Sequence, residues 1–185
     1  MERSDILRAL QNLAPQDHTV LFYSDIAAKR SLIFPFLQDA LAKQGMAVYA
    51  TGHEPLDEVR AAMRLSGIDV DNREAERSLI IEDIRAFTTA AGGLDDLKID
   101  QALADYATHA GPIRIVADPT ILVKQDMIDE VIRRERILRR RLELPLTVVC
   151  PYEDTVASAR EGEFLIDMLR THNYAIFPGI AMLLT

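Results

Sequence analysis

The segment LFYSDIAAKRSL, residues 21–32, runs from an apolar stretch into a helical pattern and carries Lys29 where an ATPase would hold its phosphate-binding lysine. A phosphate loop of the form G-x-x-x-x-G-K-[ST] needs two glycines, so that backbone N–H groups can close around the phosphates, and a hydroxyl that holds magnesium. Tyr23 and Ala28 stand at the glycine positions, and Arg30 stands at the hydroxyl position. We therefore expect no nucleotide site, and we interpret Lys29 and Arg30 as the solvated face of a first helix.

Polar and aromatic side chains follow each of the predicted strands. The carboxyl ends of parallel strands meet at one edge of a sheet, which is where open α/β folds bind ligands. The candidate ligand-binding residues at this edge are Tyr23, Asp25, Thr51, Asp83, Asp118, Cys150 and Tyr152.

Two of these carboxylates have alternative roles. Asp118 follows IRIVA, where many ATPases hold a magnesium-linked aspartate, but without a phosphate loop we favour a cap on the helix after Pro119. Asp83 ends LIIED, and both ligand contact and acceptance of backbone N–H bonds in the following turn stay open for it.

Cys150 is the single cysteine, and the histidines His18, His53, His109 and His172 lie on different segments without H-x-x-x-H spacing. We therefore expect no metal site and no cofactor. The thiol of Cys150 is interpreted as a polarisable wall of a pocket for an apolar or halogenated ligand. His18 precedes the first strand, and we expect a structural role for it.

Pro151 lacks an N–H group and is predicted to turn the chain out of the sheet directly after Cys150. Tyr152 would then reach over the edge and meet Tyr23. Two tyrosines in this arrangement would enclose a small organic molecule and orient it through a hydroxyl.

Short apolar runs alternate with longer segments of helical period, and this alternation predicts an α/β fold in three layers, with helices on both faces of a mostly parallel sheet. The predicted strands are Thr19–Tyr23, Met46–Thr51, Ser78–Glu82, Ile113–Ala117 and Leu146–Cys150. The predicted helices are Ile26–Lys43, Leu56–Leu65, Ile99–His109, Ile121–Leu142 and Thr155–Arg170. A last strand, Tyr174–Phe177, and a Pro178-Gly179 turn into Ile180–Leu184 suggest an edge hairpin.

The composition is that of a globular protein: 185 residues, 49% apolar and 27% charged, with a net charge of −8. The negative charge disfavours nucleic acid, and the chain contains no apolar run long enough for a membrane span. One cysteine fits a reducing cytoplasm. We divide the chain into an N-terminal helix, residues 1–14, and one domain, residues 15–185.

Five segments together resemble the MEDS family, the methanogen/methylotroph sensory domain found in a dichloromethane-responsive repressor and in signalling proteins. They are DHTVLFYSD (17–25), FLQDALAKQGMAVYAT (36–51), GIDVDNREAERSLIIED (67–83), GPIRIVADP (111–119) and LPLTVVCPYE (144–153). The resemblance implies a RecA/KaiC-like domain with a degenerate phosphate loop that senses small organic compounds. The repressor also carries a helix-turn-helix, for which residues 1–16 are too short, so the resemblance implies a sensory domain alone.

Six arginines crowd residues 133–141, and Arg133, Arg136 and Arg140 are our candidates for contact with a partner protein. The same stretch also fits an exposed helix face, because Asp129/Arg133, Glu130/Arg134 and Glu135/Arg139 are acid-before-base pairs spaced by four residues.

The function that we expect is a non-enzymatic sensor that binds a small organic ligand, C1 or hydrocarbon-derived, and signals to a regulatory partner as a homodimer. The alternatives are a protein-interaction module of the same fold without a ligand, and a degenerate nucleotide-binding domain or an enzyme.

Overall fold

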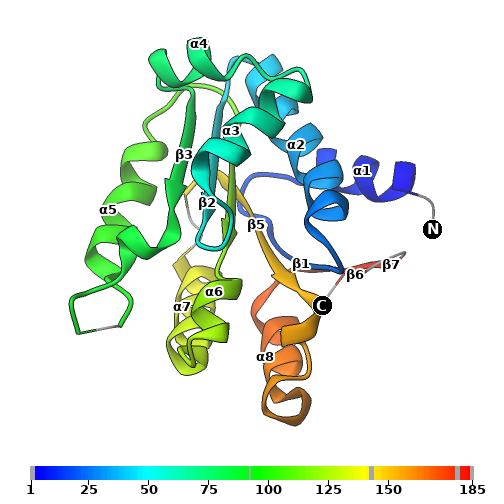
Figure 1. The fold of residues 1–185 in the computed structure, drawn as a ribbon, viewed down its shortest axis with the longest axis vertical. Helices are drawn as coiled ribbons and strands as arrows, with labels where there is room; N and C mark the ends of the chain where they lie inside the picture. Colours follow the sequence, from blue (N-terminus) through cyan, green and yellow to red (C-terminus); the bar gives the residue numbers. More distant parts are fainter. Residues whose placement is uncertain (1–2, 92, 142–143, 178–179, 184–185) are drawn as a thin grey trace.

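A seven-stranded sheet forms the centre of the computed structural model, which describes residues 3–91, 93–141, 144–177 and 180–183. The strand order is β3-β2-β4-β5-β1-β6-β7 (Figure 1). The strands are β1 His18–Tyr23, β2 Met46–Thr51, β3 Leu79–Asp83, β4 Ile113–Asp118, β5 Leu146–Glu153, β6 Tyr174–Phe177 and β7 Ile180–Leu183.

Strands β1 to β6 pair in parallel, and β7 pairs antiparallel with β6. β1, β2 and β4 are almost entirely buried, as expected for strands that are covered by helices on both faces. The mostly parallel α/β sheet is therefore confirmed. The expected edge hairpin has both of its strands, while its Pro178-Gly179 turn lies outside the described residues.

Helices cover both faces of the sheet (Figure 1). One face carries α1 Arg3–Gln11, α2 Ile26–Ala42, α3 Leu56–Leu65 and α4 Val70–Ala75. The other carries α5 Asp96–Tyr106, α6 Thr120–Lys124, α7 Ile128–Arg141 and α8 Glu163–Thr171, with the 3-10 turns η1 Ile84–Phe87, η2 Asp154–Val156 and η3 Ala159–Gly162. α1 packs on α2, and its Ile6 and Leu10 join the core of the first face.

Two predicted helices are shorter than expected. The segment 121–142 forms two helices, α6 and α7, because Asp126 has a φ of 64° and interrupts the helical backbone. The helix predicted over Thr155–Arg170 is wrong in its first half, where the chain makes two 3-10 turns. Gly162, with a φ of 92°, precedes α8 in a left-handed conformation that favours glycine.

Pro151 does not end β5, which continues to Glu153 beside β1. The pairing of β5 with β4 stops at Val149, so the side of Pro151 that lacks an N–H faces no strand. Two residues further on, the Glu153 N–H on that same side donates to Thr120 Oγ1 instead. A proline is tolerated there because no ladder bond is lost.

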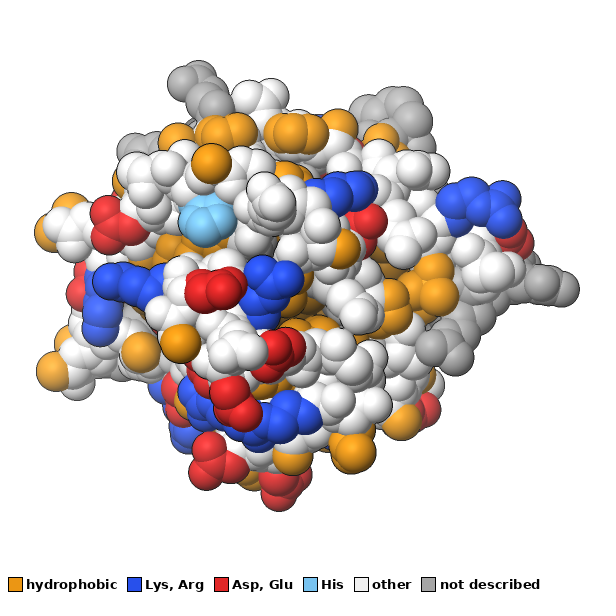
Figure 2. Space-filling view, turned by 90° about the horizontal axis from the view of Figure 1, so that it is seen from above, with side chains coloured by type: hydrophobic (Ala, Val, Ile, Leu, Met, Phe, Trp, Pro, Cys, Tyr) orange, Lys and Arg blue, Asp and Glu red, His pale blue; other side chains and the backbone are white. Residues whose placement is uncertain are grey.

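The molecule seen in Figure 2, from above the view of Figure 1, presents basic and acidic side chains next to each other. Ion pairs also join α3 to α4, with Arg60 3.0 Å from Glu74 and Arg64 2.5 Å from Asp71. In the described part of the chain, no helix is both long and apolar enough to cross a membrane.

Candidate functional site

Lys29 is fully buried at the start of α2, so its interpretation as part of a solvated helix face is wrong. Its Nζ donates to Glu54 Oε1 at 2.5 Å and to Asp118 Oδ2 at 2.8 Å. It also lies 4.9 Å from the centroid of the Tyr23 ring and 5.7 Å from that of Tyr49. Two carboxylates and two aromatic faces therefore compensate the desolvation of this ammonium group.

The two carboxylates have further donors. Tyr49 donates its hydroxyl to Glu54 at 2.5 Å, and Tyr23 donates to Asp118 at 3.0 Å. Burial opposes ionisation of Glu54, but Lys29 and Arg30 outweigh it and hold the pKa of Glu54 below its ordinary value. Burial and the nearby carboxylates raise the pKa of both tyrosines.

This arrangement pairs with each other the two charged residues that the sequence comparison with an ATPase singles out. The lysine that would reach a phosphate is already neutralised, and the aspartate that would hold magnesium is the partner of that lysine. Asp118 Oδ1 also accepts the Thr120 N–H at 3.1 Å, at the first residue of α6, although the N-cap residue of that helix is Pro119 and not Asp118 as predicted.

Three other candidates lie near this edge of the sheet. Thr51 pairs in register with Asp83 on one side and with Asp118 on the other, so the sheet brings these three residues together as expected. Asp83 accepts the Arg85 N–H and pairs with the Arg85 side chain, and Asp25 caps α2 by accepting the Ala28 N–H at 2.7 Å. Both carboxylates thus have local structural partners.

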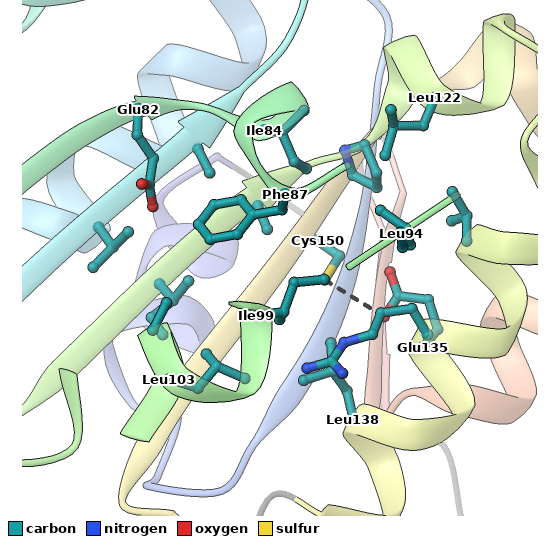
Figure 3. Close-up of a pocket in the computed structure, with 18 of the residues that line it drawn as sticks. Glu82, Ile84, Phe87, Leu94, Ile99, Leu103, Leu122, Glu135, Leu138 and Cys150 are labelled. Atoms are coloured by element: carbon teal, nitrogen blue, oxygen red, sulfur yellow. Dashed lines mark hydrogen bonds between the residues drawn. The ribbon is translucent and has the colours of Figure 1, made fainter. Parts of the chain in front are cut away.

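A cavity of about 110 Å³ lies on the opposite face, between the sheet, η1, α5 and α7 (Figure 3). Its walls are mainly apolar and include Val48, Ala50, Ile84, Phe87, Leu94, Ile99, Ala102, Leu103, Ile115, Leu122 and Leu138. This cavity was not predicted from the sequence, because η1 and α5 enclose it over a face of the sheet, whereas the predicted site lay at the strand ends. Cys150, which we interpreted as a pocket wall, does line it.

Polar groups stand at two sides of the cavity. At one side, Tyr106 donates its hydroxyl to Glu82 at 2.9 Å, and burial raises the pKa of Glu82. At the other side lie Arg134, Glu135 and Cys150, and Figure 3 shows Phe87 and Ile99 between this side and Glu82. A small molecule in the cavity would meet an almost entirely apolar surface, with these polar side chains at its two sides.

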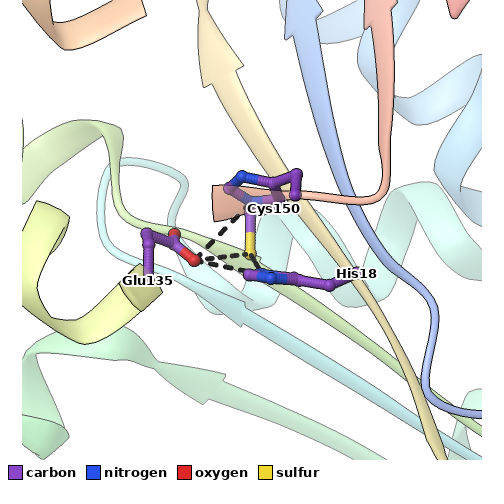
Figure 4. Close-up of side chains that lie close together, drawn as sticks. His18, Glu135 and Cys150 are labelled. Carbon is purple, nitrogen blue, oxygen red and sulfur yellow. Dashed lines mark hydrogen bonds and ion pairs between the residues drawn. The ribbon is translucent and has the colours of Figure 1, made fainter. Parts of the chain in front are cut away.

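Beside the cavity, four buried residues form what we call the histidine cluster: His18, Glu135, Cys150 and His172. They come from the start of β1, from α7, from β5 and from the end of α8. Figure 4 shows the Glu135 carboxylate, the Cys150 sulfur and the His18 ring converging. Glu135 Oε2 lies 3.0 Å from His18 Nε2 and 3.7 Å from Cys150 Sγ.

Tyr152 does not meet Tyr23, and this expectation is wrong. Tyr152 is fully buried among the side chains under α5 to α8 and stands beside Phe22, while Tyr23 faces the Lys29 side of the sheet. Alternate residues of a strand point to opposite faces, and β5 keeps its register through Pro151. The hydroxyl of Tyr152 donates to Glu135 at 2.5 Å.

The arginines of α7 pair mostly with neighbouring helices. Arg133 lies 2.5 Å from Asp96 of α5 and 2.9 Å from Glu130, and Arg136 lies 2.6 Å from Asp167 of α8. The side chain of Arg140 lies outside what the structure describes. The expected pair of Glu135 with Arg139 is wrong, because Glu135 turns into the histidine cluster.

Residues 17–173 match the family model described as MEDS, the methanogen/methylotroph, DcmR sensory domain. The chain belongs to the MEDS family. A comparison of this MEDS domain with curated proteins gave no match.

Among solved structures, the MEDS domain is similar to a KaiC-like protein of the hyperthermophilic archaeon Pyrococcus horikoshii. The TM-score is 0.64 at 16% sequence identity, over 88% of this chain and 71% of the other. At this identity the likeness shows the fold, and it confirms the predicted RecA/KaiC-like architecture.

Proposed function

We propose that this MEDS domain is a non-enzymatic sensor that binds a small apolar organic molecule in the cavity between the sheet and helices α5 and α7. The observation that carries the proposal is the cavity itself, with its apolar walls and its polar groups at two sides. Concave apolar sites with a few convergent polar groups are the usual form of small-molecule sites. A volume of about 110 Å³ suits molecules with a few carbon or halogen atoms.

The chemistry of the polar groups supports binding over catalysis. Burial, together with the Glu135 carboxylate, raises the pKa of the Cys150 thiol, and a protonated thiol is a poor nucleophile. Glu82 and Tyr106 bond to each other and offer a polar end for orienting a ligand.

The signal of ligand binding would leave the cavity through a change in the position of α5. Within the described residues, none of the side chains of α5 is buried, and ion pairs attach the helix to α7. Asp96 lies 2.5 Å from Arg133, and Asp100 lies 3.0 Å from Arg134. A helix with so little burial opens at low cost. A ligand beneath it adds contacts, favours the closed position and thereby changes the surface that α5 and α7 offer to a regulatory partner.

The experiment is a thermal-shift screen of C1–C4 alcohols, amines, thiols and halocarbons on three proteins. Ala102 of α5 lines the cavity, and Ala104 of the same helix is exposed. Ala102→Phe should fill the cavity and abolish the ligand-induced rise in Tm, whereas the matched control Ala104→Phe should keep it. Equal shifts in both variants would refute the cavity as the ligand site.

The proposed assembly is a homodimer, which is the commonest closed arrangement of identical chains. Light scattering should give twice the chain mass of 20.7 kDa at micromolar concentration. A monomer mass would remove the dimer from the proposal and leave the ligand site untouched.

A further inference from the structure

The histidine cluster has the donor set of a transition-metal site. Two imidazole nitrogens, one sulfur and one carboxylate oxygen all lie within 4.8 Å of one another, and all four residues are buried. His18 Nε2 lies 3.3 Å from Cys150 Sγ and 3.0 Å from Glu135 Oε2, and His172 Nε2 lies 3.6 Å from the same oxygen. A tetrahedron with bonds of about 2.1 Å to nitrogen and oxygen and about 2.3 Å to sulfur has edges of roughly 3.3–3.7 Å.

His172 points an unshared electron pair into this cluster. Its Nδ1 lies 2.7 Å from the Met168 carbonyl oxygen, and because a carbonyl only accepts, Nδ1 carries the proton. In the neutral imidazole, a proton on Nδ1 leaves the unshared electron pair on Nε2. That fully buried Nε2 has no hydrogen-bond partner among the described residues and faces the Glu135 carboxylate.

Two acceptors that face each other without a hydrogen or a cation between them repel. A proton on His18 would compensate the charge of Glu135 but would leave His172 Nε2 unpaired. A metal ion at the centre of the cluster satisfies the carboxylate, the thiol sulfur and both imidazoles at once. The Nδ1–H bond to Met168 is also the contact to a carbonyl that metal-binding histidines usually make with their second nitrogen.

A second group of possible ligands, His53, Glu54 and Asp118, does not carry the same inference. The ammonium group of Lys29 already lies between its two carboxylates, 2.5 Å from Glu54 and 2.8 Å from Asp118. In the histidine cluster, no lysine or arginine of the described residues pairs with Glu135, whose ion-pair partners are the two imidazoles.

We propose that His18, Glu135, Cys150 and His172 bind one divalent transition-metal ion of the zinc class. Nitrogen and sulfur donors in a four-coordinate arrangement select zinc, iron or cobalt over magnesium and calcium. Binding displaces the thiol proton of Cys150 to solvent, and the thiolate and the Glu135 carboxylate then neutralise the dication. The site joins residues as far apart in sequence as His18 and Cys150, so metal should stabilise the fold whether or not a ligand occupies the cavity.

The test uses untagged protein from cells grown with added zinc or cobalt and purified under reducing conditions without chelator. We expect about one metal ion per chain by native mass spectrometry and elemental analysis. The cobalt form should show a near-ultraviolet thiolate-to-cobalt charge-transfer band. Because Cys150 is the single cysteine, that band in the wild-type protein assigns the ligand even if a variant fails to fold.

Variants locate the ion. Cys150→Ser should abolish the charge-transfer band, and His172→Gln should lower metal affinity by more than the roughly 10- to 100-fold that loss of an outer partner costs. His109→Gln, outside both groups of ligands, should bind as the wild type does. Absence of retained metal, a cobalt spectrum without the thiolate band, or metal lost through His53→Gln and kept in Cys150→Ser would overturn the proposal. The first of these results would leave His18 and Glu135 as a metal-free ion pair.

Discussion

The ammonium nitrogen of Lys29 lies 2.8 Å from Asp118 Oδ2, inside the protein. In the sequence these are the two residues that we compared with the phosphate-contacting lysine and the magnesium-linked aspartate of an ATPase. Here they bind each other, with Glu54 as a second partner of the lysine. The fold is that of a RecA/KaiC-like domain, while the two charges that a nucleotide would need form an ion pair with each other.

We expect no Mg-ATP binding tighter than millimolar, because a phosphate would have to displace two buried carboxylates from Lys29 and would find no glycine loop. Desolvating the separated charges costs more than one phosphate contact returns. Calorimetric titration measures this directly, and a micromolar dissociation constant would contradict it.

Lys29→Met should destabilise the protein by about 3–5 kcal/mol, because removal of one partner leaves the other charges buried and unpaired. Lys43→Met is the matched control. Lys43 lies at the opposite, C-terminal end of the same helix, where it is exposed and pairs with Asp39 at 2.8 Å, and its loss should cost about 1 kcal/mol or less. Urea unfolding of both variants decides the point, and equal losses of stability would contradict a larger contribution from the buried contacts of Lys29.

The fold was predictable, and the positions of its polar residues were partly so. Apolar runs and helical spacing located the strands, including both strands of the edge hairpin, and the main helices, because burial on a sheet or under a helix repeats along the chain. Register also placed Thr51, Asp83 and Asp118 together.

The predictions that were wrong concern contacts between segments that are distant in the sequence. Glu135 lies three residues after Ile132 and seven after Ile128, on the apolar stripe of α7, and Lys29 lies four before Ile33 on the buried stripe of α2. A charged residue in an apolar stripe indicates a buried partner, and this signal was present in the sequence. The partners of such a residue depend on the order of the strands in the sheet. That order brings His18, Cys150 and His172 together at Glu135, and local spacing in the sequence does not encode it.

Tyr152→Phe should lower the free energy of unfolding by about 1.5–3 kcal/mol, because the hydroxyl donates to the buried Glu135 carboxylate at 2.5 Å. Tyr152→Ala should cost about 3–5 kcal/mol through the cavity that it leaves in the core. The partly buried Tyr174 offers a control, since Tyr174→Phe should change stability by about 0.5 kcal/mol or less. A neutral Tyr152→Phe would show that Glu135 does not depend on this hydroxyl.

Glu82 should make stability fall as pH rises. Burial raises its folded-state pKa above the ordinary value of 4.5, so the folded protein binds more protons than the unfolded chain between that value and the raised pKa. The contribution is fully present below about pH 4.5 and is lost as the pH passes the raised pKa. Glu82→Gln should therefore exceed the wild type in stability by a margin that grows through this window.

The measurement is urea unfolding of wild type and Glu82→Gln from pH 4 to pH 8. The exposed Glu58 supplies the control, because Glu58→Gln should leave the pH dependence unchanged. A margin between Glu82→Gln and wild type that shrinks with rising pH would contradict the assignment.

The most direct test of the sensor proposal is a crystal structure with a small brominated alkane, read by the anomalous scattering of bromine. We expect an anomalous peak in the cavity, between Glu82 and Cys150 and against Phe87 and Ile99. The peak should be absent from Ala102→Phe crystals that are treated in the same way. A cavity without bromine in the wild type, or a peak that persists in Ala102→Phe, would contradict the claim that this MEDS domain binds its ligand there.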